Sequence, residues 1–79
     1  MTIGETYQNV NDSSVIEYVE TISTYMKYNS KTKRNELKRL SDPKMIFIYT
    51  ESDTKKGKQA EFKESEWERL VKQVMFVKI

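Results

Sequence analysis

The sequence predicts an α+β fold in which a β-hairpin and a C-terminal helix share one hydrophobic core. Residues 44–50 are apolar on both alternating faces, which is typical of a strand that is covered on both sides. A polar loop rich in turn-forming residues separates them from a second strand, residues 58–62. From Trp67 onward, apolar residues recur at helical spacing.

The N-terminal residues are predicted to lie outside the fold. Residues 2–14 are polar, rich in Asn, Ser and Thr, and contain Gly4. Such a segment has little apolar surface to bury, so we expect residues 1–14 to form a flexible N-terminal arm. Residues 15–79 are then one folded domain.

Residues 15–28 carry two conflicting signals. Ser14 and Glu17 match a capping box, and the apolar residues that follow have helical spacing. Yet the segment is dominated by Val, Ile, Thr and Tyr, which favour strands. A helix over residues 15–27 would give an α-α-β-β-α chain. The residues alone leave both readings open.

A polar turn over residues 29–33 leads into a short segment, residues 34–41. Leu37 and Leu40 in that segment fit either one helical turn or a strand with a bulge. The Asp42-Pro43 pair is expected to end it.

The last third of the chain predicts a hairpin strand followed by an amphipathic helix. Ala60 and Phe62 share one face of the second hairpin strand, and Ser65 with Glu68 matches a capping box. An apolar helical stripe, expected in the core or at a dimer interface, is formed by Trp67, Leu70, Val71 and Val74. The apolar tail, residues 75–79, is expected to pack on the sheet or on a partner chain.

The composition excludes several kinds of chemistry. The 79 residues include no His and no Cys, so disulfides, thiolate nucleophiles, imidazole bases and Cys or His zinc sites are ruled out. We expect a non-enzyme without metal or cofactor. A chain this short buries little surface, so we expect a homodimer. No apolar run approaches the roughly 18–20 residues of a membrane span, and the N-terminus does not resemble a signal peptide. We therefore expect a cytoplasmic protein without a membrane partner.

The net charge of +2 hides an asymmetry along the chain. Residues 1–30 carry a net charge of −3, residues 31–58 carry +5, and residues 59–79 are neutral. A local positive patch attracts polyanions even when the whole chain is nearly neutral. This pattern fits a nucleic-acid partner and also a solubilising surface, and the charge alone leaves both readings open.

Two stretches, residues 29–41 and 55–67, resemble the single-stranded-DNA-binding domain of the positive-cofactor-four family of transcriptional coactivators, especially its small bacterial and phage relatives. The resemblance spans about residues 18–74. Ile48-Tyr49 stands where the family usually carries Ile-Arg, and the family's Asp before that Ile is Phe47 here.

The resemblance implies a four-stranded curved antiparallel sheet, β-β-β-β-α, with residues 15–28 as its first strand and the helix behind it. It also implies a dimer that holds single-stranded DNA or RNA in a sheet-lined channel, in transcription or in replication and repair. Binding of this kind tolerates any sequence, because cations follow the phosphates and flat side chains stack on bases.

On this arrangement the helix covers the face of Ile46 and Ile48, and Phe47 and Tyr49 lie on the open face beside first-strand residues such as Tyr25. Phe47 and Tyr49 would contact bases. The predicted phosphate-binding residues lie mostly in the two basic turns: Lys27, Lys31, Lys33, Arg34, Lys38, Lys55, Lys56 and Lys58.

A second hypothesis keeps the fold and changes the partner. The apolar C-terminus and the acidic N-terminal segment, residues 1–30, could instead form an interface for another protein. The chain would then be a small phage or mobile-element adaptor or inhibitor that binds a host protein, for example one of the transcription machinery.

Overall fold

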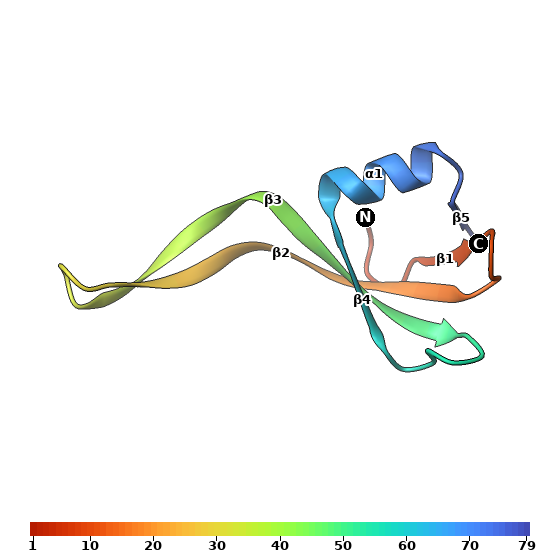
Figure 1. The fold of residues 1–79 in the computed structure, drawn as a ribbon, viewed down its shortest axis with the longest axis horizontal. Coiled ribbons are helices and arrows are strands. Elements are labelled where there is room, and N and C mark those ends of the chain that lie inside the picture. Colours follow the sequence, from red (N-terminus) through yellow and green to blue (C-terminus); the bar gives the residue numbers. More distant parts are fainter.

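The computed structural model confirms the α+β class, with one antiparallel sheet and one short helix (Figure 1). The sheet has five strands, one more than predicted, in the order β4-β3-β2-β1-β5. In chain order the elements are β1 (Thr6–Asn9), β2 (Val15–Asn29), β3 (Arg34–Glu51), β4 (Gln59–Lys63), α1 (Glu64–Lys72) and β5 (Phe76–Lys78).

The ambiguous segment after Ser14 is a strand, so the helical alternative for residues 15–27 is wrong. β2 pairs with β3 along its whole length, from Val15 opposite Glu51 to Asn29 opposite Arg34. The β-branched and aromatic residues of β2 fit a pleated surface with cross-strand neighbours. This pairing outweighs the helical spacing of the apolar residues.

β3 continues through Asp42 and Pro43, where the sequence predicts a stop. Ile22 pairs with Lys44 and Thr24 pairs with Arg39, so residues 40–43 of β3 lie opposite a single residue of β2. A proline is tolerated in such a bulge because it has no ladder hydrogen bond to donate there. Bulges bend strands, and this one marks where the outer hairpin leaves the rest of the sheet.

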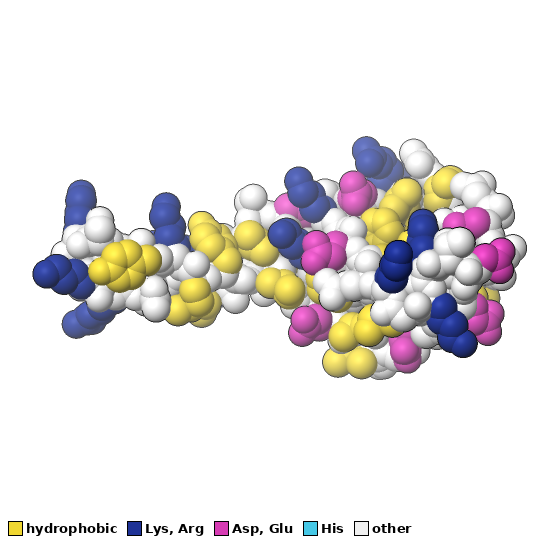
Figure 2. Space-filling view, turned by 60° about the horizontal axis from the view of Figure 1, so that its bottom comes forward, with side chains coloured by type: hydrophobic (Ala, Val, Ile, Leu, Met, Phe, Trp, Pro, Cys, Tyr) yellow, Lys and Arg dark blue, Asp and Glu magenta, His cyan; other side chains and the backbone are white.

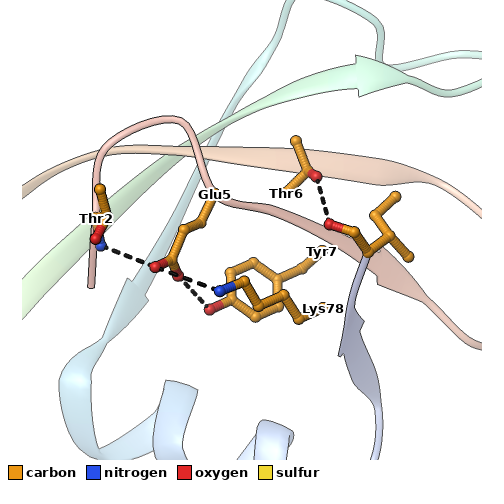
Figure 3. Close-up of polar contacts among 6 residues, drawn as sticks. Thr2, Glu5, Thr6, Tyr7 and Lys78 are labelled. Carbon is orange, nitrogen blue, oxygen red and sulfur yellow. Dashed lines mark hydrogen bonds and ion pairs between the residues drawn. The ribbon is translucent and has the colours of Figure 1, made fainter.

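The prediction of a flexible arm over residues 1–14 is wrong, because the N-terminal segment contributes a strand to the sheet. β1 pairs with both β2 and β5, and Tyr7 belongs to the hydrophobic core. The apolar tail therefore packs on its own sheet, as one of the two predicted alternatives stated. Because β5 joins β1, the first and the last strand of the chain lie side by side (Figure 3).

A polar cluster holds these ends together (Figure 3). The Tyr7 hydroxyl donates to Glu5 Oε2 at 2.8 Å, and Lys78 Nζ lies 3.6 Å from Glu5 Oε1. Burial, and then the contact with Glu5, raise the pKa of Tyr7 to about 12. The same hydrogen bond from Tyr7, followed by the one from the Thr2 N–H, lowers the pKa of Glu5.

The core lies between α1 and the sheet, and it is largely aromatic. Phe47 is fully buried, and its ring centroid lies 4.5 Å from that of Trp67. The expected face assignment is therefore wrong: Met45 and Phe47 belong to the core cluster under α1. On the other face Ile46 is buried but lies outside that cluster, and Ile48 is 39% exposed. Since Phe47 also touches Phe62 and Tyr18, its ring fills space that an isoleucine would leave empty.

Ala60 and Phe62 do face the helix, as predicted. Trp67 is a core residue and Leu70 packs partly buried against the core. Val71 and Val74 are exposed, by 39% and 58%, so their predicted place in the core is wrong. α1 ends at Lys72, and Val74 lies beyond it with a φ of 57°.

Candidate nucleic-acid interface

The outer part of the β2–β3 hairpin, residues 23–40, projects from the molecule as a two-stranded ribbon (Figure 1). We call this segment the ribbon and the remaining residues the body. The molecule measures 50 × 25 × 20 Å, and the ribbon accounts for its elongation. No residue of the ribbon is buried. Core packing therefore does not explain its residues.

The ribbon concentrates positive charge. It carries six basic residues and one acidic residue, a net charge of +5, and the body carries a net charge of −3. In the view of Figure 2 the acidic side chains lie over the body, while the ribbon shows basic and hydrophobic ones. The asymmetry seen along the sequence is therefore an asymmetry in space.

Cross-strand pairing divides the ribbon into two faces, because directly opposed residues share a face. The first we call the basic face; it holds Tyr25, Lys27, Asn29, Arg34, Glu36 and Lys38. The second we call the apolar face; it holds Thr24, Met26, Tyr28, Asn35, Leu37 and Arg39.

The one acidic residue of the ribbon is occupied by neighbours on its own face. Glu36 lies 3.0 Å from Lys38 Nζ and accepts a 2.8 Å hydrogen bond from Asn29 Nδ2. Lys38, followed by Asn29, lowers the pKa of Glu36, so the carboxylate stays charged. The other five basic side chains of the ribbon form no ion pair. Their charge is directed to solvent.

Near its tip, the ribbon is hollowed. A cavity of about 350 Å³ is lined mainly by polar and basic residues: Lys27, Tyr28, Asn29, Ser30, Lys31, Glu36 and Lys38. Asn29 Oδ1 accepts a hydrogen bond from the Lys31 N–H at 2.9 Å, which shapes the turn. The turn closes at Lys33 in the left-handed region, with φ of 55°.

The structure separates the predicted phosphate-binding residues into two groups. Lys27, Lys31, Lys33, Arg34 and Lys38 lie on the ribbon. The other three, Lys55, Lys56 and Lys58, lie in the β3–β4 loop at the opposite end of the molecule (Figure 1). One short strand of nucleic acid cannot follow both groups without crossing the acidic body.

The predicted base-stacking pair does not lie on an open face. Phe47 is fully buried against Trp67, so its placement was wrong. Tyr49 packs against the core on the helix side, and Lys55 Nζ lies 5.4 Å from its ring centroid. The face opposite α1 instead carries three carboxylates, Glu17, Glu20 and Glu61, and two lysines, Lys44 and Lys63. It therefore has no net positive charge to attract a polyanion.

Sequence reasoning missed part of the ribbon. Arg39, Met26, Tyr28 and Leu37 are exposed on it, and none of them was assigned to a site. The signal for them is the alternation of polar and apolar side chains along β2 after the bulge. This alternation has meaning only if the segment is a strand, and the sequence also allowed a helix there.

The comparisons with known proteins add no assignment. Neither protein-family models, nor curated proteins, nor solved structures give a match to this chain. The single helix is too short and too polar to cross a membrane. No three Asp or Glu side chains come together as a metal site would require.

Proposed function

We propose that the protein binds single-stranded nucleic acid through the ribbon. The observation that carries the proposal is the net charge of +5 on a projecting segment without a core role, next to a body of −3. Phosphate contacts of this kind supply most of the affinity in sequence-tolerant binding. The acidic body repels the same backbone and so directs a strand to the ribbon.

Single strands are favoured because the basic face combines cations with an exposed ring. Tyr25 is 44% exposed and lies directly opposite Lys38, with Lys27 on the same face. A base stacked on an aromatic ring gains about 1–3 kcal/mol, and only an unpaired strand can offer its base faces. The arrangement thus fits a base on Tyr25 with a flanking phosphate on Lys27, whereas the ammonium of Lys38 already lies 3.0 Å from Glu36.

Fluorescence anisotropy with a labelled oligo-dT, and with a duplex of equal length, tests the proposal. We expect tighter binding of the single strand, with an affinity that falls steeply with salt. If folded protein at micromolar concentration binds neither probe at low salt, the proposal is wrong.

Paired variants locate the binding surface. Lys27→Gln with Arg34→Gln, which changes two basic side chains of the basic face that form no ion pair, should weaken binding. It should also reduce the slope of log affinity against log salt by about 1.4, since each single-strand phosphate contact contributes about 0.7. The matched control, Lys55→Gln with Lys56→Gln, removes the same charge at the far end of the molecule. Equal losses from the two variants would place the interface elsewhere.

A further inference from the structure

The apolar face of the ribbon exposes more hydrophobic surface than a solvated strand needs. Met26, Tyr28 and Leu37 are 61%, 60% and 67% exposed, and Met26 pairs directly with Leu37 across the two strands. Exposed apolar groups that lie next to one another mark interaction sites more often than scattered ones do. These three side chains therefore form a candidate contact surface.

No segment of the same chain can cover this face, because the ribbon extends away from α1 and from both chain ends (Figure 1). A second copy can. Of the six residues on the apolar face only Arg39 is charged, whereas the basic face carries Lys27, Arg34, Glu36 and Lys38. Two apolar faces can therefore meet while both basic faces point outward.

We infer that two copies of the chain pair through the apolar faces of their ribbons. A two-fold axis near the Met26–Leu37 pair gives an isologous contact in which the same patch meets itself. In the antiparallel arrangement the two bodies lie at opposite ends and the basic tips stay apart. Arg39, near the base of one ribbon, then lies diagonally opposite Tyr28, near the tip of the other, within reach of a long guanidinium side chain.

The buried area makes this pairing weak. At roughly 100 Å² for each of the six apolar side chains, about 600 Å² leaves water, below the 1,200–2,000 Å² of stable interfaces. Repulsion between two ribbons of +5 weakens it further. Because salt screens that repulsion, the pairing should strengthen with salt, opposite in sign to the binding of nucleic acid.

Sedimentation equilibrium without nucleic acid tests the pairing independently of the proposed function. For the wild type we expect a monomer–dimer equilibrium whose association constant rises about tenfold between about 0.05 and 0.5 M NaCl. Met26→Ser with Leu37→Ser should lower that constant by more than about tenfold. The matched control, Ile3→Ser with Ile79→Ser, changes two exposed apolar residues of the body and should leave it unchanged.

A monomer at every salt concentration up to about 1 mM protein would overturn the inference, as would a dimer that the ribbon variant leaves intact. If the ribbon variant instead loses affinity for oligo-dT while the wild type is monomeric, the apolar face contacts bases rather than a second copy.

A second measurement serves if the double variant fails to fold. Because the chain has no Cys, single cysteines can be placed at will. A short bis-maleimide should crosslink Leu37→Cys into dimers faster than Lys38→Cys, one residue away on the basic face. Equal crosslinking rates at the two positions would contradict pairing through the apolar face.

Discussion

The carboxylate of Asp42 accepts hydrogen bonds from both the backbone N–H of Ser65, at 3.2 Å, and its hydroxyl, at 2.5 Å. Asp42 lies in the bulge of β3, and Ser65 lies in the first turn of α1, whose N-cap, Lys63, provides no side-chain cap. A residue distant in the sequence therefore supplies the cap. The base of the ribbon is tied to the helix that covers the core.

Replacing this cap should destabilise the whole domain. Asp42→Ala removes both hydrogen bonds and leaves donors of the first turn without a protein partner. Loss of such a cap should lower Tm by about 4–8 °C in a domain of this size. Thermal unfolding by circular dichroism measures it, with the exposed Asp53→Ala as control. An unchanged Tm would show that Asp42 does not cap α1.

The same contact should make stability depend on pH. Hydrogen bonds from the Ser65 hydroxyl and N–H lower the pKa of Asp42 in the folded state. Its contribution is therefore complete above the ordinary aspartate pKa, about 4, and is lost as the pH falls through the lower folded-state value. Asp42→Asn should lose less stability than the wild type between about pH 5 and pH 2. Urea midpoints across that range measure the difference, and parallel curves would contradict it.

The two faces of β3 should respond differently to truncation. Phe47 is fully buried, so Phe47→Ala should cost about 3–5 kcal/mol and leave little folded protein. Ile48→Ala, next to it on the exposed face, should cost less than about 1.5 kcal/mol. Urea unfolding of both variants checks the assignment. A larger loss of unfolding free energy for Ile48→Ala than for Phe47→Ala would mean that the face of Ile48, and not that of Phe47, packs under α1.

The sequence could predict the order of strands and helix but not which face of β3 is inward. Residues 45–49 are apolar on both parities, so alternation carries no information there. The choice depends on Trp67, whose ring packs against Phe47 with an interplanar angle of 37°, and that contact joins residues twenty positions apart. Tertiary packing decided what the local pattern left undetermined.

The candidate site was predicted only in part for a related reason. Lys31, Lys33 and Arg34 were identified because their charges cluster in the sequence. The distance between these residues and the loop of Lys55 could not be predicted, because it follows from the four-residue bulge at Asp42-Pro43. With that bulge the first hairpin extends outward, instead of folding back as two short strands.

The ribbon should be dispensable for folding and necessary for binding. Replacing residues 26–37 with an Asn-Gly turn removes four basic residues and one acidic residue, but no buried side chain. Tm should change by less than about 4 °C, while the affinity for oligo-dT should fall to background. Circular dichroism and anisotropy on the same sample separate the two effects. Unfolding of the shortened chain would give the ribbon a structural role.

Removing the Tyr7 hydroxyl should alter stability at high pH. Burial and the bond to Glu5 raise the pKa of Tyr7 to about 12, above the ordinary value of about 10. The folded state thus holds this proton more tightly than the unfolded chain. Its contribution is complete below pH 10 and is lost as the pH rises from about 10 to 12.

Tyr7→Phe should therefore cost about 1 kcal/mol at neutral pH, the usual value of one hydrogen bond, and then lose less stability than the wild type above pH 10. Urea midpoints of the wild type and of the variant at about pH 8 and pH 11 measure how the difference in their stability changes with pH. Tyr25→Phe, which removes an exposed hydroxyl on the ribbon, serves as the control. A wild type and a Tyr7→Phe variant that lose stability in parallel above pH 10 would mean that Glu5 does not hold the phenol proton.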